Sequence, residues 1–184
     1  MGAELLMVIL DSFIWLHVPK VAGTGIRGQL KEQGGHSVEG FIEHKGRKVR
    51  AAHLIPEEIR EIIHEDQLRR PTLAFCRHPM GRFRSICSFM NVSPDYVIDR
   101  LKTEDHWYDF EARMMLPQLA YTFEDTNWIR IEEVEGKTIE IEGVKIDFSQ
   151  YHNTSQSDSV NLTAEHEAFV KEYYAPDFDK FKYA

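Results

Sequence analysis

Two short apolar runs, each followed by a proline-containing turn and a helical segment, constrain the fold more than any other feature. The first run spans 13–18 and stops at Pro19, and the second spans 72–76 and is followed by Pro79. Apolar runs of this length that end abruptly are typical of buried parallel strands. Because a helical sequence follows each run, the pattern predicts an α/β domain with a mostly parallel central sheet flanked by helices.

The other segments add more helices and one hairpin to this unit. We expect helices over 24–31, 56–66, 80–90, 93–102, 104–121 and 163–174, of which 104–121 is bent or interrupted by Pro117. A strand is expected over 128–131, and a hairpin over 138–146 turns at Glu142-Gly143. The sequence has no internal repeat, and 184 residues suit one core, so residues 1–184 are expected to form a single domain.

Charge and cysteine content exclude several classes of function. The formal net charge of -8 disfavours general nucleic-acid binding, although one pocket can still be locally positive and bind a small anion. The two cysteines, Cys76 and Cys87, are expected to be reduced core residues, and no Cys/His spacing predicts a metal site. The apolar N-terminal stretch is interrupted at Asp11-Ser12 and lacks a basic region before it, which predicts no membrane span and a cytoplasmic protein.

The turn after the first run, Pro19 to Gly25, has the composition of a phosphate-binding loop. A strand that passes through a tight loop into a helix directs free backbone N–H groups and the helix dipole at one point, which attracts phosphate. Gly23 and Gly25 permit close approach of the backbone, Thr24 adds a hydroxyl donor, and Lys20 adds a mobile charge. The lysine precedes the Gly-Thr pair, so the segment is not a Walker A loop. Taken alone, it is equally compatible with an ordinary strand-to-helix turn.

A second basic segment follows the second run. Arg77 is expected at the carboxyl edge of the sheet, where ligands of α/β sheets bind, and Ser85 lies about two turns into the next helix. Arginine binds phosphate through two donors at once, and a hydroxyl adds a third. Basic residues near a helix N-terminus are mildly unfavourable, so their presence indicates an anion nearby, although a solvated basic helix start is the plain alternative.

Together, the two segments resemble the PAPS-dependent sulfotransferases, and most closely the carbohydrate-type branch with its Golgi and bacterial members. The 5′-phosphosulfate loop of that superfamily reads Pro-Lys-x-x-Gly-Thr, as in 19–24 here, and its 3′-phosphate segment reads Arg-x-Pro-x-x-Arg-x-x-Ser, as in 77–85. Pro117-Gln118, residues 153–155 and the aromatic ending 173–183 resemble weaker motifs of that branch. Gly25 departs from the family, which usually has a second hydroxyl residue there, and the chain is short.

The resemblance implies a P-loop-NTPase-like three-layer domain that transfers a sulfuryl group from PAPS (3′-phosphoadenosine 5′-phosphosulfate) to a hydroxyl or amine and releases PAP, without a metal. Lys20 would contact the bridging oxygen, and Arg82 is expected to brace its segment. The nucleotide-binding residues that the resemblance implies are Ala22, Gly23, Thr24 and Gly25 for the 5′-phosphate, and Arg77 and Ser85 for the 3′-phosphate.

The general base and the residues that face the acceptor lie outside the two phosphate segments and are predicted from weaker similarities. His53 is the first choice of base because its segment resembles a histidine segment between the two phosphate motifs of some relatives, and histidine titrates near neutrality. His17 is the second choice. Gln118 and His152 are expected to face the acceptor, a small molecule or a glycan.

Two alternative functions remain open from the sequence. A P-loop kinase would need an acidic metal ligand after the second strand, where Arg77 and His78 stand instead. A nucleotide-binding module without sulfotransfer activity would keep both phosphate segments and lack a working acceptor site.

Overall fold

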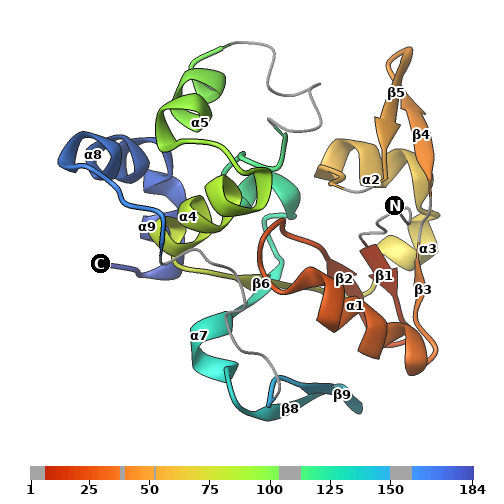
Figure 1. The fold of residues 1–184 in the computed structure, drawn as a ribbon. Helices are drawn as coiled ribbons and strands as arrows, with labels where there is room; N and C mark the ends of the chain where they lie inside the picture. The colour runs from red at the N-terminus through yellow and green to blue at the C-terminus, as the bar shows by residue number, and fades with distance from the viewer. Residues whose placement is uncertain (1–6, 38–39, 52, 104–112, 150–158) are drawn as a thin grey trace.

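A mixed five-stranded sheet lies at the centre of the fold, in a computed structural model that describes residues 7–37, 40–51, 53–103, 113–149 and 159–184 (Figure 1). The strand order is β3-β1-β2-β6-β7. The strands span His36–Ser37 (β3), Met7–Ile9 (β1), Ile14–Leu16 (β2), Thr72–Cys76 (β6) and Asn127–Arg130 (β7). β2, β6 and β7 are parallel, whereas β1 is antiparallel to both of its neighbours. The chain therefore has an α/β fold, but the sheet is only partly parallel, which corrects the expectation of a mostly parallel sheet.

The turn at Asp11-Ser12 explains this difference. The N–H of Leu10 donates to the carbonyl of Phe13 at 2.9 Å, and Ile9 is paired with Ile14. A turn this short can join only antiparallel neighbours, because parallel neighbours need a crossover connection. The apolar residues before Asp11 thus form a hairpin strand of the same sheet.

Most expected helices are present, with changed ends. The helices span Gly23–Glu32 (α1), Pro56–Ile62 (α2), Glu65–Leu68 (α3), Pro79–Met90 (α4), Pro94–Leu101 (α5), Gln118–Tyr121 (η2, a 3-10 helix), Ile131–Val134 (α7), Ala164–Tyr173 (α8) and Ala175–Phe181 (α9). The helix expected over 56–66 is split into α2 and α3. Of the helix expected over 104–121, residues 104–112 lie outside the described part, and Pro117 stands at the N-terminal cap of η2.

Two hairpins complete the fold. The expected hairpin is formed by β8 (Thr138–Ile141) and β9 (Val144–Asp147). A second hairpin, β4 (Phe41–His44) and β5 (Arg47–Arg50), lies in a region for which the sequence showed only weak periodicity. Its turn residues Lys45 and Gly46 have φ of 50° and 71°, as in the tight turns that suit the twist of antiparallel strands.

The buried apolar residues form two clusters. One surrounds the sheet and α1, and the other lies among α4, α5 and α8. Figure 1 shows the same division: α4, α5, α8 and α9 lie together on one side, away from α1 and α2, and β6 lies between these groups. Cys76 and Cys87 are buried free thiols, and burial raises their pKa to about 12 and about 11.

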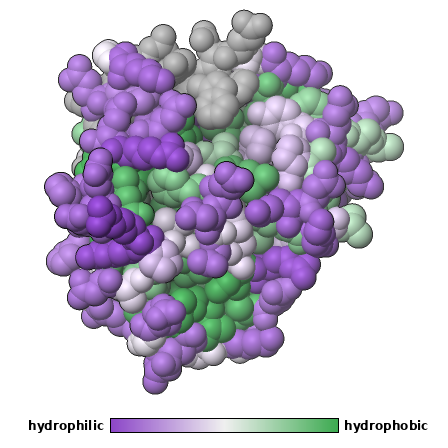
Figure 2. All heavy atoms as spheres, turned by 180° about the vertical axis from the view of Figure 1, so that it is seen from behind, coloured by the Kyte–Doolittle hydropathy of each residue, from purple (hydrophilic) through white to green (hydrophobic). Residues whose placement is uncertain are grey.

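Polar side chains cover much of the face seen in Figure 2, with smaller apolar areas between them. Among the described residues, no helix combines the length and the apolar character that crossing a membrane requires.

Candidate functional site

The two basic segments lie next to each other at one edge of the sheet. β2 and β6 are parallel neighbours, with Leu16 paired to Ala74. The loop that leaves β2 toward α1 and the turn that leaves β6 toward α4 therefore leave the sheet at the same edge. Ligands of α/β sheets bind at this edge.

The loop after β2 has the backbone shape of an anion site. Lys20 and Ala22 have φ of 65° and 53°, the left-handed region that non-glycine residues rarely adopt. Ala22 is the N-cap of α1, and within the described residues no side chain caps the first turn. A left-handed residue that enters a helix turns successive N–H groups toward a common point. The amides of Gly23, Thr24 and Gly25 are thus available to a ligand.

Gly25 differs from Gly23 in its surroundings. Thr24 and Gly25 are exposed, and a Cβ at Gly25 would have no atom within 4 Å. A Cβ at Gly23 would lie 1.7 Å from Nε2 of His17. Only Gly23 is therefore required by packing, and its lack of a side chain lets the imidazole of His17 lie against the start of α1.

His17 is held neutral inside a group of cations. Its ring stacks on Trp15 with centroids 5.3 Å apart, and its Nδ1 is buried without a hydrogen-bond partner among the described residues. Burial, followed by the charges of Arg27, Lys20 and Arg82, lowers the pKa of His17 to about 3. Positive charge therefore acts on the residue that lies against the start of α1.

Acidification is expected to destabilise the protein through His17. The folded pKa of about 3 lies below the ordinary value of 6.5, so between these pH values the unfolded chain binds a proton that the folded chain excludes. The free energy of unfolding should fall by up to about 1.4 kcal/mol for each pH unit below 6.5. Urea unfolding of wild type and His17→Gln can be measured at pH 7.5, 6 and 5. As the pH falls, the free energy of unfolding of the variant should rise relative to that of wild type. His64→Gln, at a side chain that is 79 % exposed, is the control, and a pH-independent difference for His17→Gln would contradict the assignment.

His53 lies beside His17 and is buried. The two ring centroids are 5.7 Å apart, and His53 also meets the ring of Tyr121 edge-on at 6.4 Å. The structure thus brings both base candidates of the sequence together, next to the loop. Neither histidine is an exposed surface residue.

The ammonium of Lys20 lies over an exposed aromatic ring. Its Nζ is 3.8 Å from the ring centroid of Phe89, on α4, and Phe89 is 55 % exposed. A cation–π contact at an exposed site contributes about 0.5–1 kcal/mol, which a phosphate group can readily outweigh. Sequence reasoning did not single out Phe89, because an isolated aromatic residue in a helix carries no motif.

Arg77 is mostly buried, and its guanidinium has no hydrogen-bond partner among the described residues. Only 9 % of Arg77 is exposed, and all its described hydrogen bonds are made by its main chain. The Nε of Arg77 lies 3.4 Å from the position of a Cβ on Gly81, so its side chain covers the first turn of α4. Cations of mostly buried residues are normally paired, so a guanidinium without a described partner suits the binding of an anionic ligand.

Arg82 and Ser85 are buried on the same helix. Arg82 is 1 % exposed and donates to three carbonyls: to Pro19 at 2.9 Å through Nε, and to Leu116 and Met114 at 2.8 Å each through Nη1 and Nη2. Arg82 thus connects α4 to the loop after β2 and to the segment before η2, contacts that suit the bracing role expected from the sequence. Ser85 lies further along α4 and is also buried.

The two predicted acceptor residues differ in outcome. Gln118 is fully buried, and its amide contacts the main chain of Arg77. His152 lies outside the described residues. No group of three His, Cys, Asp or Glu residues in the described part is placed to hold a metal ion.

A buried ion pair that the sequence did not reveal lies behind Tyr121, the residue whose ring contacts His53. Arg113 and Glu58 form two hydrogen bonds, at 2.6 Å and 3.1 Å, and the hydroxyl of Tyr121 donates to the carbonyl of Arg113. Glu58 lies in the first turn of α2, and its carboxylate faces inward. No local signal pairs residues this far apart in the chain.

These features define an α/β protein with a candidate anion site at the carboxyl ends of β2 and β6. Comparisons with family models, with curated proteins and with solved structures found no significant match to this chain.

Proposed function

We propose that the chain is a PAPS-dependent sulfotransferase that transfers the sulfuryl group to a hydroxyl or amine of a small-molecule or glycan acceptor. This proposal is carried by Arg77, which is 9 % exposed and whose guanidinium makes no hydrogen bond within the described residues, at the same sheet edge as the loop of Lys20 and Ala22. A cation site next to a phosphate loop suits a ligand with two separated anionic groups, which PAPS has at its 5′ and 3′ positions. The proposal includes the finer fold expectation, a P-loop-like three-layer arrangement around β2, its loop and α1.

In the proposed complex, the amides of Gly23, Thr24 and Gly25 hold the 5′-phosphate, and Arg77 with Ser85 holds the 3′-phosphate. Catalysis by the chain is positioning and charge stabilisation, as in phosphoryl transfer. Lys20 leaves the ring of Phe89 and donates to the bridging oxygen. The cations Arg27, Lys20 and Arg82, whose charges act on His17 in the same loop region, favour binding of the anionic nucleotide.

The transfer itself is an in-line displacement at sulfur. The acceptor oxygen forms a bond to sulfur while the bond from sulfur to the bridging oxygen breaks, and its electron pair stays on the 5′-phosphate of PAP. The acceptor proton passes to His53. A general base of this kind contributes typically ~10²–10⁴-fold to the rate.

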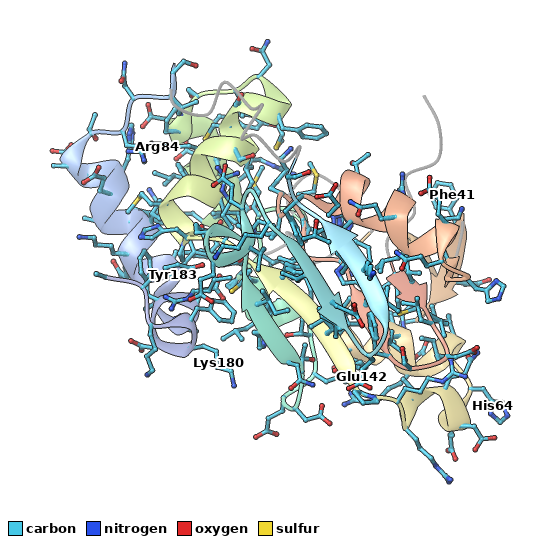
Figure 3. The ribbon with its side chains drawn as sticks, turned by 90° about the horizontal axis from the view of Figure 1, so that it is seen from below. Phe41, His64, Arg84, Glu142, Lys180 and Tyr183 are labelled. Carbon is cyan, nitrogen blue, oxygen red and sulfur yellow. The ribbon has the colours of Figure 1, made fainter. Side chains whose placement is uncertain are left out.

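Ligand binding gives the direct test. PAP at about 100 times its dissociation constant should stabilise the protein by ~2.7 kcal/mol, or about 5–10 °C in melting temperature for a chain of this length. Arg77→Ala should abolish the shift. Arg84→Ala is the control, because it removes an equal charge from a partly exposed arginine of the same helix, next to Glu167 of α8 (Figure 3). This variant should keep the PAP-induced shift in melting temperature.

Absence of any shift with millimolar PAP would refute the nucleotide assignment. Stabilisation by ATP with magnesium but not by PAP would favour the kinase-like alternative. Transfer is measured with labelled PAPS against neutral glycans, lipids and small alcohols. A chain that binds PAP but transfers to none of them, with Lys20→Ala indistinguishable from wild type, would instead be a binding module.

A further inference from the structure

Arg77 lies one residue beyond the paired part of β6. The last pairs of β6 are Cys76 with Arg130 on one side and Ala74 with Leu16 on the other. Among the described strands, none pairs with the main chain of Arg77, a residue that is 9 % exposed.

The side chain of Gln118 takes the place of that missing strand. The N–H of Arg77 donates to Oε1 of Gln118 at 2.9 Å, and Nε2 of Gln118 donates to the carbonyl of Arg77 at 2.8 Å. Because one rigid amide bonds both the N–H and the carbonyl of Arg77, it fixes the position and orientation of the Arg77 main chain. The direction in which the Arg77 side chain leaves the sheet depends on this contact.

Asp177 of α9 holds Gln118 in turn. Its carboxylate accepts from the N–H of Gln118 at 2.7 Å and from the N–H of Leu119 at 3.1 Å, which caps the first turn of η2. Asp177 is fully buried, like Gln118. The helix α9 thus reaches Arg77 through a single intermediate residue.

A second connection runs from the C-terminus to the residue after Arg77. The N–H of His78 donates to Glu132 at 2.7 Å, and the hydroxyl of Tyr183 donates to the other oxygen of Glu132 at 2.8 Å. The ring of His78 lies against Tyr183, with centroids 4.9 Å apart, and Figure 3 shows Tyr183 beside the C-terminal helix. Both residues of the turn after β6 are therefore held from the C-terminal end of the chain.

We propose that Gln118 and Asp177 are positioning residues that aim the Arg77 guanidinium and so set the preference for nucleotides with a 3′-phosphate. This inference rests on the proposed function, because it assigns the 3′-phosphate to Arg77. It gives the C-terminal helix a role in ligand selection in addition to packing.

The test compares PAP with adenosine 5′-monophosphate, which lacks only the 3′-phosphate. Gln118→Met keeps the length of the side chain but cannot accept from or donate to Arg77. Its dissociation constant for PAP should rise at least about 10-fold, while that for the monophosphate changes less than about 2-fold. Calorimetry measures PAP binding, and competition against PAP measures the weaker ligand.

Gln33→Met is a matched control. The amide of Gln33 contacts the main chain of Lys145 in the same two-bond manner, at 2.6 Å and 2.9 Å, between α1 and β9. This variant loses a contact with the same pair of bonds, at an exposed position, and should keep the selectivity of wild type. In an Arg77→Ala background, Gln118→Met should cause no further loss of PAP affinity, because both changes act through one guanidinium.

The outcomes separate the inference from the proposed function. If wild type does not prefer PAP, the proposed 3′-phosphate site is refuted, and the inference with it. If wild type prefers PAP and Gln118→Met keeps that preference, or loses further affinity in the Arg77→Ala background, the inference alone is refuted. Should Gln118→Met lose its native circular dichroism, Asp177→Asn replaces it, with the same selective loss expected and the same preserved preference overturning the inference.

Discussion

Arg82→Met is expected to lower the free energy of unfolding by about 3–5 kcal/mol, because three buried carbonyls lose a charged donor at once. Those carbonyls belong to Pro19 in the loop and to Leu116 and Met114 in the segment before η2. The guanidinium also lies 5.9 Å from the ring centroids of both Tyr121 and Tyr174. No hydrophobic side chain replaces these contacts.

Urea unfolding measures this loss, and Arg84→Met is its control. Arg84 is on the same helix, but it is partly exposed, and its contact with Glu167 is 3.8 Å long. Its replacement should change stability by less than about 0.5 kcal/mol. A loss below about 1 kcal/mol for Arg82→Met would mean that the carbonyls find other donors, and that Arg82 does not brace the loop.

Glu58→Ala is expected to cost about 3–5 kcal/mol, because it leaves Arg113 as an uncompensated buried charge. The two side chains are 3 % and 5 % exposed, and their closest contact is 2.6 Å. Glu58 also accepts from the N–H of Ile55, the N-cap residue of α2. The loss should therefore disturb the start of α2 as well as the support of Tyr121 and His53.

The double variant Glu58→Met, Arg113→Met distinguishes the ion pair from the loss of volume. With both charges removed, the free energy of unfolding should return most of the way from the value of Glu58→Ala to that of wild type, since apolar pairs replace buried ion pairs at little cost. Glu57→Ala, which breaks the exposed pair of Glu57 with Lys45, should leave the unfolding midpoint unchanged. Equal losses in the single and double variants would show that packing, not charge, dominates at this position.

The positions of strands and helices followed from local patterns to different degrees. The segments 72–76 and 138–146 were expected as strands and are strands, because the apolar run and the alternation fall within a few residues. The direction of β1 was not expected, since the role of Asp11-Ser12 as a hairpin turn depends on pairing across it. The hairpin of β4 and β5 was missed because its strands are short and their sequence has only weak periodicity.

The candidate site divides in the same way. The residues of the two phosphate segments were found by spacing, because a strand, a tight turn and a helix start are contiguous in the chain. Phe89, Glu58 with Arg113, and Asp177 were not found as site residues. Their contacts join positions distant in the sequence, such as the 55 residues between Glu58 and Arg113.

The sequence alone determined an α/β chain in which two basic turns follow two buried strands, because proline, glycine and apolar runs act over neighbouring residues. Tertiary structure decided that these turns share one edge and that His17 lies against Gly23. It also turned Gln118, 41 residues from Arg77, from an expected acceptor contact into the partner of the Arg77 main chain. The partner of Gln118 depends on which main-chain groups at the end of β6 have no neighbouring strand to bond with. Those groups are defined only once the sheet has formed.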